Sequence, residues 1–295
     1  MWVRVLGSAA GGGFPQWNCA CRNCSGVRAG TVPARTRTQA SVAVSADRRR
    51  WLLVNATPDL GAQLTRLAPV RAIRESPVTA VLLTDAELDH VAGLLSLREG
   101  GALVVYATDW VLRAAAPILD ILSAYAPVER RALPVGTDVL VDEATGLSCR
   151  TIATGSTKRP RYVSEPGPDP AAVVGYRFTD PDGASLTYAP CLPALTDEVA
   201  AELKGTDCAI LDGTCWSDDE LASVGLPGKT SRSMGHAPVT GPGGSLDRFA
   251  ALPVRRRVYT HLNNTNPLLV EDSPERRRVE AVGIEVAHDG MEIEL

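Results

Sequence analysis

Residues 84–90 of the chain read Thr-Asp-Ala-Glu-Leu-Asp-His, and they directly follow the apolar run Val-Thr-Ala-Val-Leu-Leu at residues 78–83. This run is short, contains β-branched residues and is preceded by Pro77, which is typical of a buried β-strand. At its end, three carboxylates and an imidazole occur within six residues. A strand that ends in Asp89 and His90 holds an oxygen donor and a nitrogen donor on a rigid support, so the stretch indicates a metal site.

A helix N-terminus explains the same residues without a metal. In that interpretation Asp85 caps the helix, and Glu87 and Asp89 interact favourably with the helix dipole. The stretch alone does not separate the two interpretations, so the decision depends on donors elsewhere in the chain.

The composition excludes several functional classes. The 295 residues are 22% charged and 45% hydrophobic, with a formal net charge of −4, which is ordinary for a globular protein. A net negative charge does not indicate a protein that binds nucleic acid. No apolar run reaches the ~20 residues of a membrane-spanning helix. Residues 2–6 are strand-like and carry no signal-peptide pattern. We therefore expect a cytoplasmic protein that binds neither nucleic acid nor membrane.

Hairpins alternate with strand–helix units along the chain. The hairpins are predicted at residues 41–54 and at residues 173–188, the second around Asp182-Gly183. Further strands are predicted at residues 3–6, 78–83, 103–106, 149–154, 208–212, 254–261 and 284–287, and helices at residues 58–66, 91–98, 109–116, 196–203 and 274–282. Two mixed sheets with outer helices fit this order better than a doubly wound parallel sheet. No linker divides the chain, so we expect one α/β domain over residues 1–295.

Two more predicted strands end in metal-binding side chains, Asp212 and His261. Side chains at the carboxyl ends of neighbouring strands converge on one crevice. With Asp89 and His90 they supply two imidazoles and two carboxylates, a complete set of protein ligands for one divalent transition metal. This set is closer to the two-histidine, one-carboxylate sites of non-haem iron than to a zinc hydrolase site.

The opening stretch resembles the Thr-His-x-His-x-Asp-His signature of the metallo-β-lactamase superfamily, with acids in place of both leading histidines. Residues 211–214 are similar to that superfamily's bridging-aspartate motif, and residues 260–261 to its final histidine. The resemblance narrows to the family of B proteins in pyrroloquinoline quinone (PQQ) biosynthesis through residues 7–19, 234–236, 241–244, 261–267 and 289–293. It covers essentially the whole chain and implies an αββα sandwich of two mixed β-sheets with outer helices.

The resemblance also implies that one metal site has been lost. In the superfamily the two replaced histidines and a third one from mid-chain hold a first metal. Here these places carry Asp85, Glu87 and, at residues 154–157, no histidine. The ligands of the second metal map onto Asp89, His90, Asp212 and His261. We expect one firmly held divalent metal, and a weak second ion bridged by Asp212 is left open.

A mononuclear site with two histidines, carboxylates and vacant positions suits the binding of dioxygen at Fe(II). The resemblance implies hydroxylation of the tyrosine ring of a cross-linked glutamate–tyrosine precursor that is cut from a peptide. A metallohydrolase of phosphodiesterase or peptidase type, and a non-catalytic carrier of PQQ or its precursor, remain as alternatives. Other proteins of the pathway and further copies of the chain remain open as partners.

His236 lies in a glycine-flanked turn, Met-Gly-His at residues 234–236. In related phosphodiesterases of the superfamily a histidine in this region is the acid or base, so we expect His236 to donate or accept a proton. A core histidine or a helix cap explains the turn as well. Asp85 and Glu87 would then orient a metal-bound water or the substrate amine.

Three of the seven cysteines, Cys19, Cys21 and Cys24, lie two and three residues apart in a glycine-rich loop at residues 11–26. Three thiolates at this spacing occupy three corners of a zinc tetrahedron, so we predict a structural Zn²⁺. In similar phosphodiesterases a histidine is the fourth ligand, and its position here holds Asn264; water or His288 remains an alternative. The other four cysteines, Cys149, Cys191, Cys208 and Cys215, are expected to be buried small hydrophobic residues.

Overall fold

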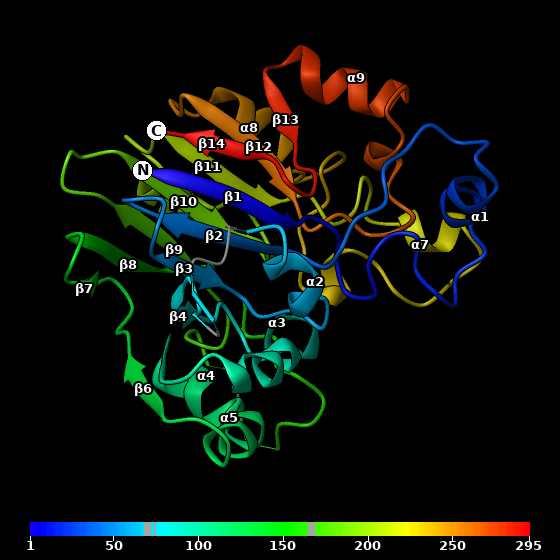
Figure 1. The fold of residues 1–295 in the computed structure, drawn as a ribbon. Helices are drawn as coiled ribbons and strands as arrows, with labels where there is room; N and C mark the ends of the chain where they lie inside the picture. Colours follow the sequence, from blue (N-terminus) through cyan, green and yellow to red (C-terminus); the bar gives the residue numbers. More distant parts are fainter. Residues whose placement is uncertain (68–71, 74, 165–168) are drawn as a thin grey trace.

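Two seven-stranded β-sheets face each other in the computed structural model, which describes residues 1–67, 72–73, 75–164 and 169–295 (Figure 1). The first sheet has the order β14 (Glu292–Glu294), β1 (Trp2–Gly7), β2 (Ser41–Ser45), β3 (Trp51–Val54), β4 (Val78–Leu82), β5 (Leu103–Ala107) and β6 (Val128–Ala132). The second has the order β13 (Ile284–Val286), β12 (Arg256–Thr260), β11 (Cys208–Asp212), β10 (Ser185–Ala189), β9 (Val174–Thr179), β8 (Leu147–Ala153) and β7 (Asp138–Asp142).

Each sheet joins an antiparallel half to a parallel half. The strand pairs from β3 to β6 are parallel, and so are the pairs from β10 to β13. The remaining neighbours in both sheets are antiparallel, including the predicted hairpins β2–β3 and β9–β10. Both sheets are therefore mixed, as the order of predicted elements indicates.

Helices cover the outer face of each sheet (Figure 1). Over the first sheet lie α2 (Leu60–Leu64), α3 (Leu88–Val91), the 3₁₀ helix η1 (Ala92–Glu99), α4 (Asp109–Ala114) and α5 (Ala116–Ser123). Over the second lie α6 (Asp197–Glu202), α8 (Leu246–Ala251), η3 (Pro267–Leu269) and α9 (Pro274–Ala281). Three short helices, α1 (Arg22–Ala29), α7 (Glu220–Ser223) and η2 (Arg232–Met234), complete the described elements. The αββα expectation is confirmed.

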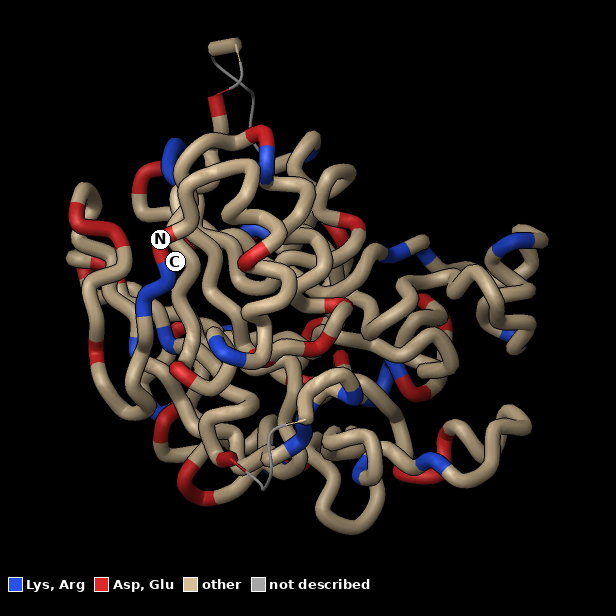
Figure 2. The backbone as a smooth tube through the Cα atoms, turned by 90° about the horizontal axis from the view of Figure 1, so that it is seen from below, with Lys and Arg blue, Asp and Glu red and all other residues tan. Residues whose placement is uncertain are grey.

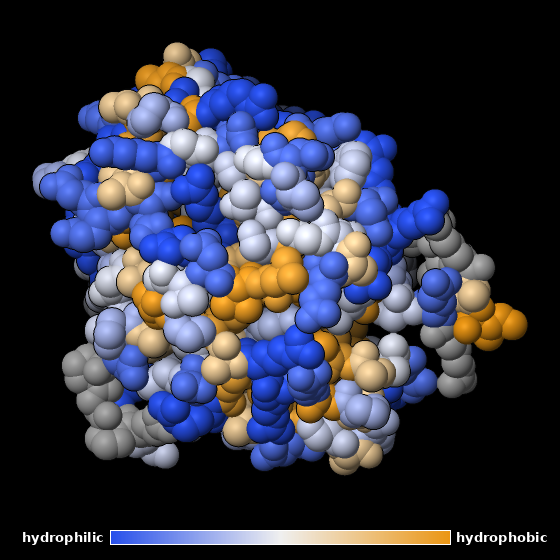
Figure 3. Space-filling model, turned by 90° about the vertical axis from the view of Figure 1, so that its left-hand side faces the viewer, coloured by the Kyte–Doolittle hydropathy of each residue, from blue (hydrophilic) through white to orange (hydrophobic). Residues whose placement is uncertain are grey.

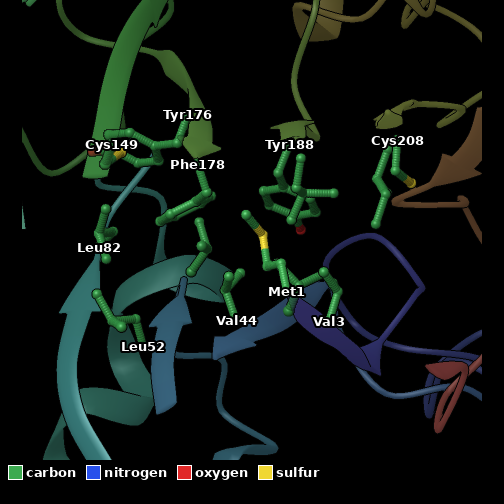
Figure 4. Close-up of a cluster of buried hydrophobic side chains, with 14 of the residues drawn as sticks. Met1, Val3, Val44, Leu52, Leu82, Cys149, Tyr176, Phe178, Tyr188 and Cys208 are labelled. Atoms are coloured by element: carbon green, nitrogen blue, oxygen red, sulfur yellow. The ribbon is translucent and has the colours of Figure 1, made fainter. Parts of the chain in front are cut away.

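The main core fills the space between the sheets. Leu52 and Leu82 of the first sheet point toward Tyr176 and Phe178 of the second (Figure 4). Full burial of each such side chain contributes about 1.5–3 kcal/mol to folding. The Tyr176 hydroxyl donates a hydrogen bond of 2.6 Å to the carbonyl oxygen of Leu83, so the core fixes the end of β4 where residues 84–90 begin.

The two ends of the chain meet in the first sheet. β1 pairs with β14 in antiparallel fashion, and the amino group of Met1 donates to the carbonyl oxygen of Leu295 at 2.9 Å. Figure 2 shows both termini side by side and the two signs of charge dispersed along the backbone. This pairing draws both ends of the chain into one half of the molecule.

Charged side chains protect one edge of the first sheet. The edge strand β6 is largely exposed and carries Glu129, Arg130 and Arg131, and charges on an edge strand oppose pairing with another chain. The face on that side of the molecule shows hydrophobic residues in small groups separated by hydrophilic ones (Figure 3). Among the described residues, none of the helices has both the length and the apolar character required to cross a lipid bilayer.

Some predicted boundaries are wrong. The helix predicted from Pro58 begins at Leu60. The helix predicted over residues 91–98 is one α-helical turn, α3, followed by the 3₁₀ helix η1. Within η1, Gly93 allows a close approach of the backbone, because its N–H donates to the carbonyl oxygen of Ala56 and a Cβ at this position would collide with the backbone of Thr57.

Other elements carried no signal strong enough to predict them. They are β6, β7, β14, α1, α5, α7 and α8. The irregular segment at residues 155–170 has neither helix nor strand in its described part, and residues 165–168 lie outside the described residues.

Candidate metal centre

Residues 84–90 leave β4 and turn into the short helix α3, which places Asp85 against His90. Asp85 is 2% exposed, and its two oxygens lie 2.9 and 2.7 Å from Nδ1 of His90. The same carboxylate accepts hydrogen bonds from the Thr84 hydroxyl and from the N–H of Glu87. The helix cap of α3 is Glu87 rather than Asp85, so the cap interpretation of Asp85 is wrong. Asp85 orients the His90 ring instead.

His261 approaches the same point from the second sheet. It directly follows β12 in a left-handed conformation with φ of 59°, and its Nδ1 lies 2.8 Å from the hydroxyl oxygen of Thr214. The His90 and His261 ring centroids are 5.4 Å apart. Asp89 stands between them, with Oδ2 3.9 Å from Nε2 of His90 and 3.8 Å from Nε2 of His261.

The free nitrogens of these two rings fit a metal. Both Nε2 atoms are buried and have no hydrogen-bond partner among the described residues. Because Asp85 accepts from Nδ1 of His90, and the Thr214 hydroxyl can accept from Nδ1 of His261, the Nε2 lone pairs of both rings are available. A buried nitrogen without a partner is costly, and a divalent cation beside Asp89 satisfies both.

Asp212 ends β11 and is surrounded by donors. Its Oδ1 accepts from the N–H of Thr214 at 2.9 Å and from the Thr214 hydroxyl at 2.7 Å. Its Oδ2 accepts from the N–H of Leu192 at 2.8 Å and lies 2.7 Å from Nδ1 of His236. The His236 ring stacks on His261, with centroids 5.1 Å apart. Asp212 therefore sets the orientation of His236 directly and that of His261 through Thr214.

The charges of the cluster are strongly coupled. Burial alone lowers the pKa of His90, but Asp85 and Asp89 outweigh burial and raise it to about 9. Burial alone raises the pKa of Asp89, yet His90 and His261 hold it well below its usual range. In the protein alone a proton on His90 thus offsets part of the negative charge of the two carboxylates, and a divalent cation can replace that proton.

Glu87 lies at the rim, apart from the buried cluster. Its carboxylate is 3.7 Å from Nζ of Lys158, and the hydroxyl of Tyr162 donates to the carbonyl oxygen of Ala86. A Cβ on Gly235, next to His236, would contact the stem of Lys158 at 2.9 Å. The described part of the irregular segment therefore lies over the site, from residues 86–87 across to the turn that carries His236.

The three cysteines of the predicted zinc loop come together as expected. Cys19, Cys21 and Cys24 place their sulfur atoms within 4.8 Å of one another. Nδ2 of Asn264 lies 3.0 Å from the sulfur of Cys19, 3.4 Å from that of Cys24 and 3.7 Å from that of Cys21. Rotation of the amide by half a turn directs its oxygen at the same point, which suits a fourth zinc ligand.

The alternative fourth ligand, His288, does not belong to the group of ligand atoms that the three cysteines form among the described residues. The cysteine loop is also tied to the loop of His261, because the Asn23 side chain donates to the carbonyl oxygens of Asn264 and Asn266. We call Cys19, Cys21, Cys24 and Asn264 the cysteine knuckle.

Cys191 is the site residue that the sequence interpretation missed. Cys149, Cys208 and Cys215 are buried as expected, but Cys191 is half-buried, and its sulfur lies within 4.8 Å of ligand atoms of His90 and His261. Burial raises the pKa of its thiol well above the usual value, and the charges of Asp85 and Asp212 raise it further. The available signal was its position just after β10, the same strand-end rule that identified Asp212.

Known proteins are similar to this chain in sequence and in fold. The Beta-lactamase superfamily domain matches residues 50–262. Coenzyme PQQ synthesis protein B of Cupriavidus necator is 48% identical, covering 99% of each chain, and that of Azoarcus sp. strain BH72 is 43% identical, covering 100% of each. The crystal structure of Zn²⁺-bound PqqB from Methylobacterium extorquens superposes with a TM-score of 0.92 at 40% identity over the whole of both chains. A diphosphatase of the PhnP family shares the fold, with a TM-score of 0.70 at 22% identity.

Proposed function

Because the chain belongs to the family of Coenzyme PQQ synthesis B proteins, within the β-lactamase superfamily, we propose that it acts in PQQ synthesis as a metal-dependent hydroxylase. Its substrate in this proposal is the cross-linked glutamate–tyrosine precursor, and the tyrosine ring gains a hydroxyl group. The metal in this proposal is Fe(II), and the cysteine knuckle holds a structural Zn²⁺.

One observation carries the proposal. The buried Nε2 atoms of His90 and His261 are without partners among the described residues, and Oδ2 of Asp89 lies within 3.9 Å of both. Two imidazoles and one carboxylate around a single point form the donor set of non-haem Fe(II) oxygenases, which leaves further coordination positions open. When bound, Fe(II) supplies the one-electron chemistry that activates dioxygen.

The state of Asp85 supports one metal rather than two. A dinuclear hydrolase requires a second set of ligands beside the first. Here Asp85 stands at one of the two positions where the superfamily signature has a histidine. It is buried and hydrogen-bonded to Nδ1 of His90. Glu87, at the other position, faces Lys158 at the rim. Neither carboxylate is placed as a free ligand of a second ion.

The proposed reaction balances as follows. A ring C–H bond breaks and a C–O bond forms with one atom of dioxygen. The other oxygen atom leaves as water, and an external reductant supplies two electrons and two protons. His236 is the group proposed to move a proton, because Asp212 holds its Nδ1 and leaves Nε2 available. Asp85 and Asp212 keep the rings in place, and Glu87 with Lys158 borders the entrance.

Anaerobic loading with Fe(II), followed by the cross-linked precursor, a reductant and dioxygen, tests the proposal. The expected result is oxygen consumption coupled to a product that is heavier by one oxygen atom, with heavy-isotope label incorporated from dioxygen. His261→Ala should abolish turnover and retain the fold, whereas His288→Ala, outside the cluster, should retain activity. Hydrolysis of a model diester without oxygen uptake would contradict the proposal and favour a metallohydrolase, and tight PQQ binding without turnover would favour a carrier.

A further inference from the structure

The hydrogen bonds of Asp212 limit its use as a metal ligand. A carboxylate has about four lone-pair positions, and Asp212 engages four protein donors at 2.7–2.9 Å. To bind a metal, it must release at least one of them. Release of the Thr214 hydroxyl loosens His261, and release of His236 frees that ring. Although Asp212, His236 and His261 also lie close enough together to hold an ion, these bonds make Asp212 a positioning residue, so a further ligand beside His261 on the second sheet would come from another residue.

Cys191 offers that donor. It follows β10, which runs parallel to β11, so it lies at the same edge of the second sheet as Asp212. Its sulfur lies within 4.8 Å of the ligand atoms of both His90 and His261. Independently, the Nε2 atoms of these two rings are directed into the same space without a partner among the described residues, and the residues are only 1% and 4% exposed.

We propose that Cys191 is a ligand of the active-site metal and binds it as a thiolate together with Asp89, His90 and His261. The inference rests on the metal site of the proposed function and adds a ligand to it. On binding, the S–H bond breaks, a sulfur–metal bond forms and the proton passes to solvent, without any change of oxidation state.

The distances of Cys191 and of Asp89 from the two histidines are compatible with this ligand set. At metal–ligand distances of about 2.0–2.3 Å, neighbouring ligand atoms stand roughly 2.8–3.8 Å apart, the shorter values for the right angles of an octahedral site with open positions and the longer ones for a tetrahedron. Oδ2 of Asp89 is already 3.9 and 3.8 Å from the two Nε2 atoms. The sulfur lies within 4.8 Å of the histidine ligand atoms, so from that limit it requires an approach of roughly 1–2 Å, which we expect from a side-chain rotation at this half-buried position.

A thiolate changes which metals the site selects. Cysteine sulfur is a soft ligand that favours iron, zinc, cobalt and copper over magnesium or calcium. The ligand set proposed here therefore predicts strong discrimination against the hard cations, which a site of imidazoles and carboxylates alone does not give to the same degree.

Titration with Co(II) tests the proposal on the purified full-length chain, with zinc retained in the cysteine knuckle. Thiolate ligation gives cobalt a charge-transfer absorption band in the near ultraviolet. We expect this band for the wild type and for Cys208→Ala, a buried cysteine outside the site, and its loss in Cys191→Ser together with at least a roughly tenfold weaker affinity. Cobalt that enters the knuckle contributes equally to all three proteins and cancels.

Alkylation of the wild-type protein gives a second measurement that does not depend on a variant. Cys191 should react with a small alkylating reagent in metal-free protein, and added Zn²⁺ should protect it, as read by peptide mass spectrometry. Cys21 serves as the internal control for the knuckle. Equal cobalt spectra and affinities for wild type and Cys191→Ser, or alkylation of Cys191 at an unchanged rate in zinc-loaded protein, would overturn the proposal.

Cobalt binding by the two variants distinguishes rejection of Cys191 as a ligand from rejection of the whole metal site. If His261→Ala abolishes cobalt binding outside the knuckle while Cys191→Ser leaves it unchanged, the metal site stands and only the thiolate is rejected. If His261→Ala leaves this binding unchanged, the metal site of the proposed function itself is rejected.

Discussion

Three of the four histidines of the chain lie in one cluster, and in each of them a side chain engages Nδ1. Asp85 holds His90, Thr214 holds His261 and Asp212 holds His236. Each contact fixes a ring and leaves its Nε2 atom for a metal or a proton. In the proposed site the three partners therefore act through the histidines that they hold.

Glu220 is a buried acid outside the histidine cluster, and we expect it to make stability depend on pH. It is 5% exposed and accepts hydrogen bonds from the N–H of Trp216 and the hydroxyl of Thr265. Burial raises its pKa from 4.5 to about 7. Between these values the folded state keeps a proton that the unfolded chain has lost, so stability falls as pH rises through this window, by about 3 kcal/mol at most, and is then constant.

Glu220→Gln should remove this pH dependence, because the amide does not ionise. Urea unfolding at pH values below and above the window measures the effect as the difference in free energy of unfolding. Glu275→Gln, which changes a glutamate lining the same pocket, should leave the dependence as in the wild type. If the free energy of unfolding of Glu220→Gln still falls with pH as in the wild type, other groups cause the dependence.

At the scale of elements, strand ends were predictable and the short turns around them were not. The buried strands β4, β11 and β12 have continuous apolar or β-branched patterns, so the positions of Asp89-His90, Asp212 and His261 followed from the sequence. The orientation of Asp85 depends on the tight turn into α3, which no periodicity encodes. Cys191 is separated from the end of β10 by one proline. A cysteine among apolar residues is usually interpreted as a core residue, and its place beside the site becomes clear only when β10 is known to run parallel to β11.

The cysteine knuckle links α1 to the loop that follows β12. Cys21→Ser should remove one thiolate, lower the zinc content by one ion per chain and cost at least about 2 kcal/mol of stability. Because Asn264 lies three residues after His261 in one loop, metal affinity at the active site should weaken as well. Zinc quantification with a colorimetric chelator, urea unfolding and cobalt titration measure the three effects.

Cys149→Ser is the matched control for the knuckle, since Cys149 lies in the core far from its sulfur cluster. It should retain the full zinc content, whatever its own effect on packing. Full zinc retention in Cys21→Ser would show that the knuckle does not hold the ion through this thiol.

At the scale of the whole molecule, the candidate site joins the two sheets. Asp89 and His90 follow β4 of the first sheet, while Cys191 and His261 follow β10 and β12 of the second. The two sheets also share the core between them. A metal held from both sides therefore ties together the two halves that the core already joins.

Active-site metal should accordingly raise the stability of the entire chain. A ligand that binds only the folded state stabilises it by about 2.7 kcal/mol at a concentration one hundred times its dissociation constant. With the knuckle zinc retained, added metal should shift one cooperative thermal transition of the wild type upward by several degrees. His90→Ala should show almost no shift, because it removes one of the two ligands from the first sheet, and His288→Ala should shift like the wild type. Calorimetry that instead resolves two transitions, with only one of them moved by the metal, would show that the halves unfold independently and that the site does not couple them.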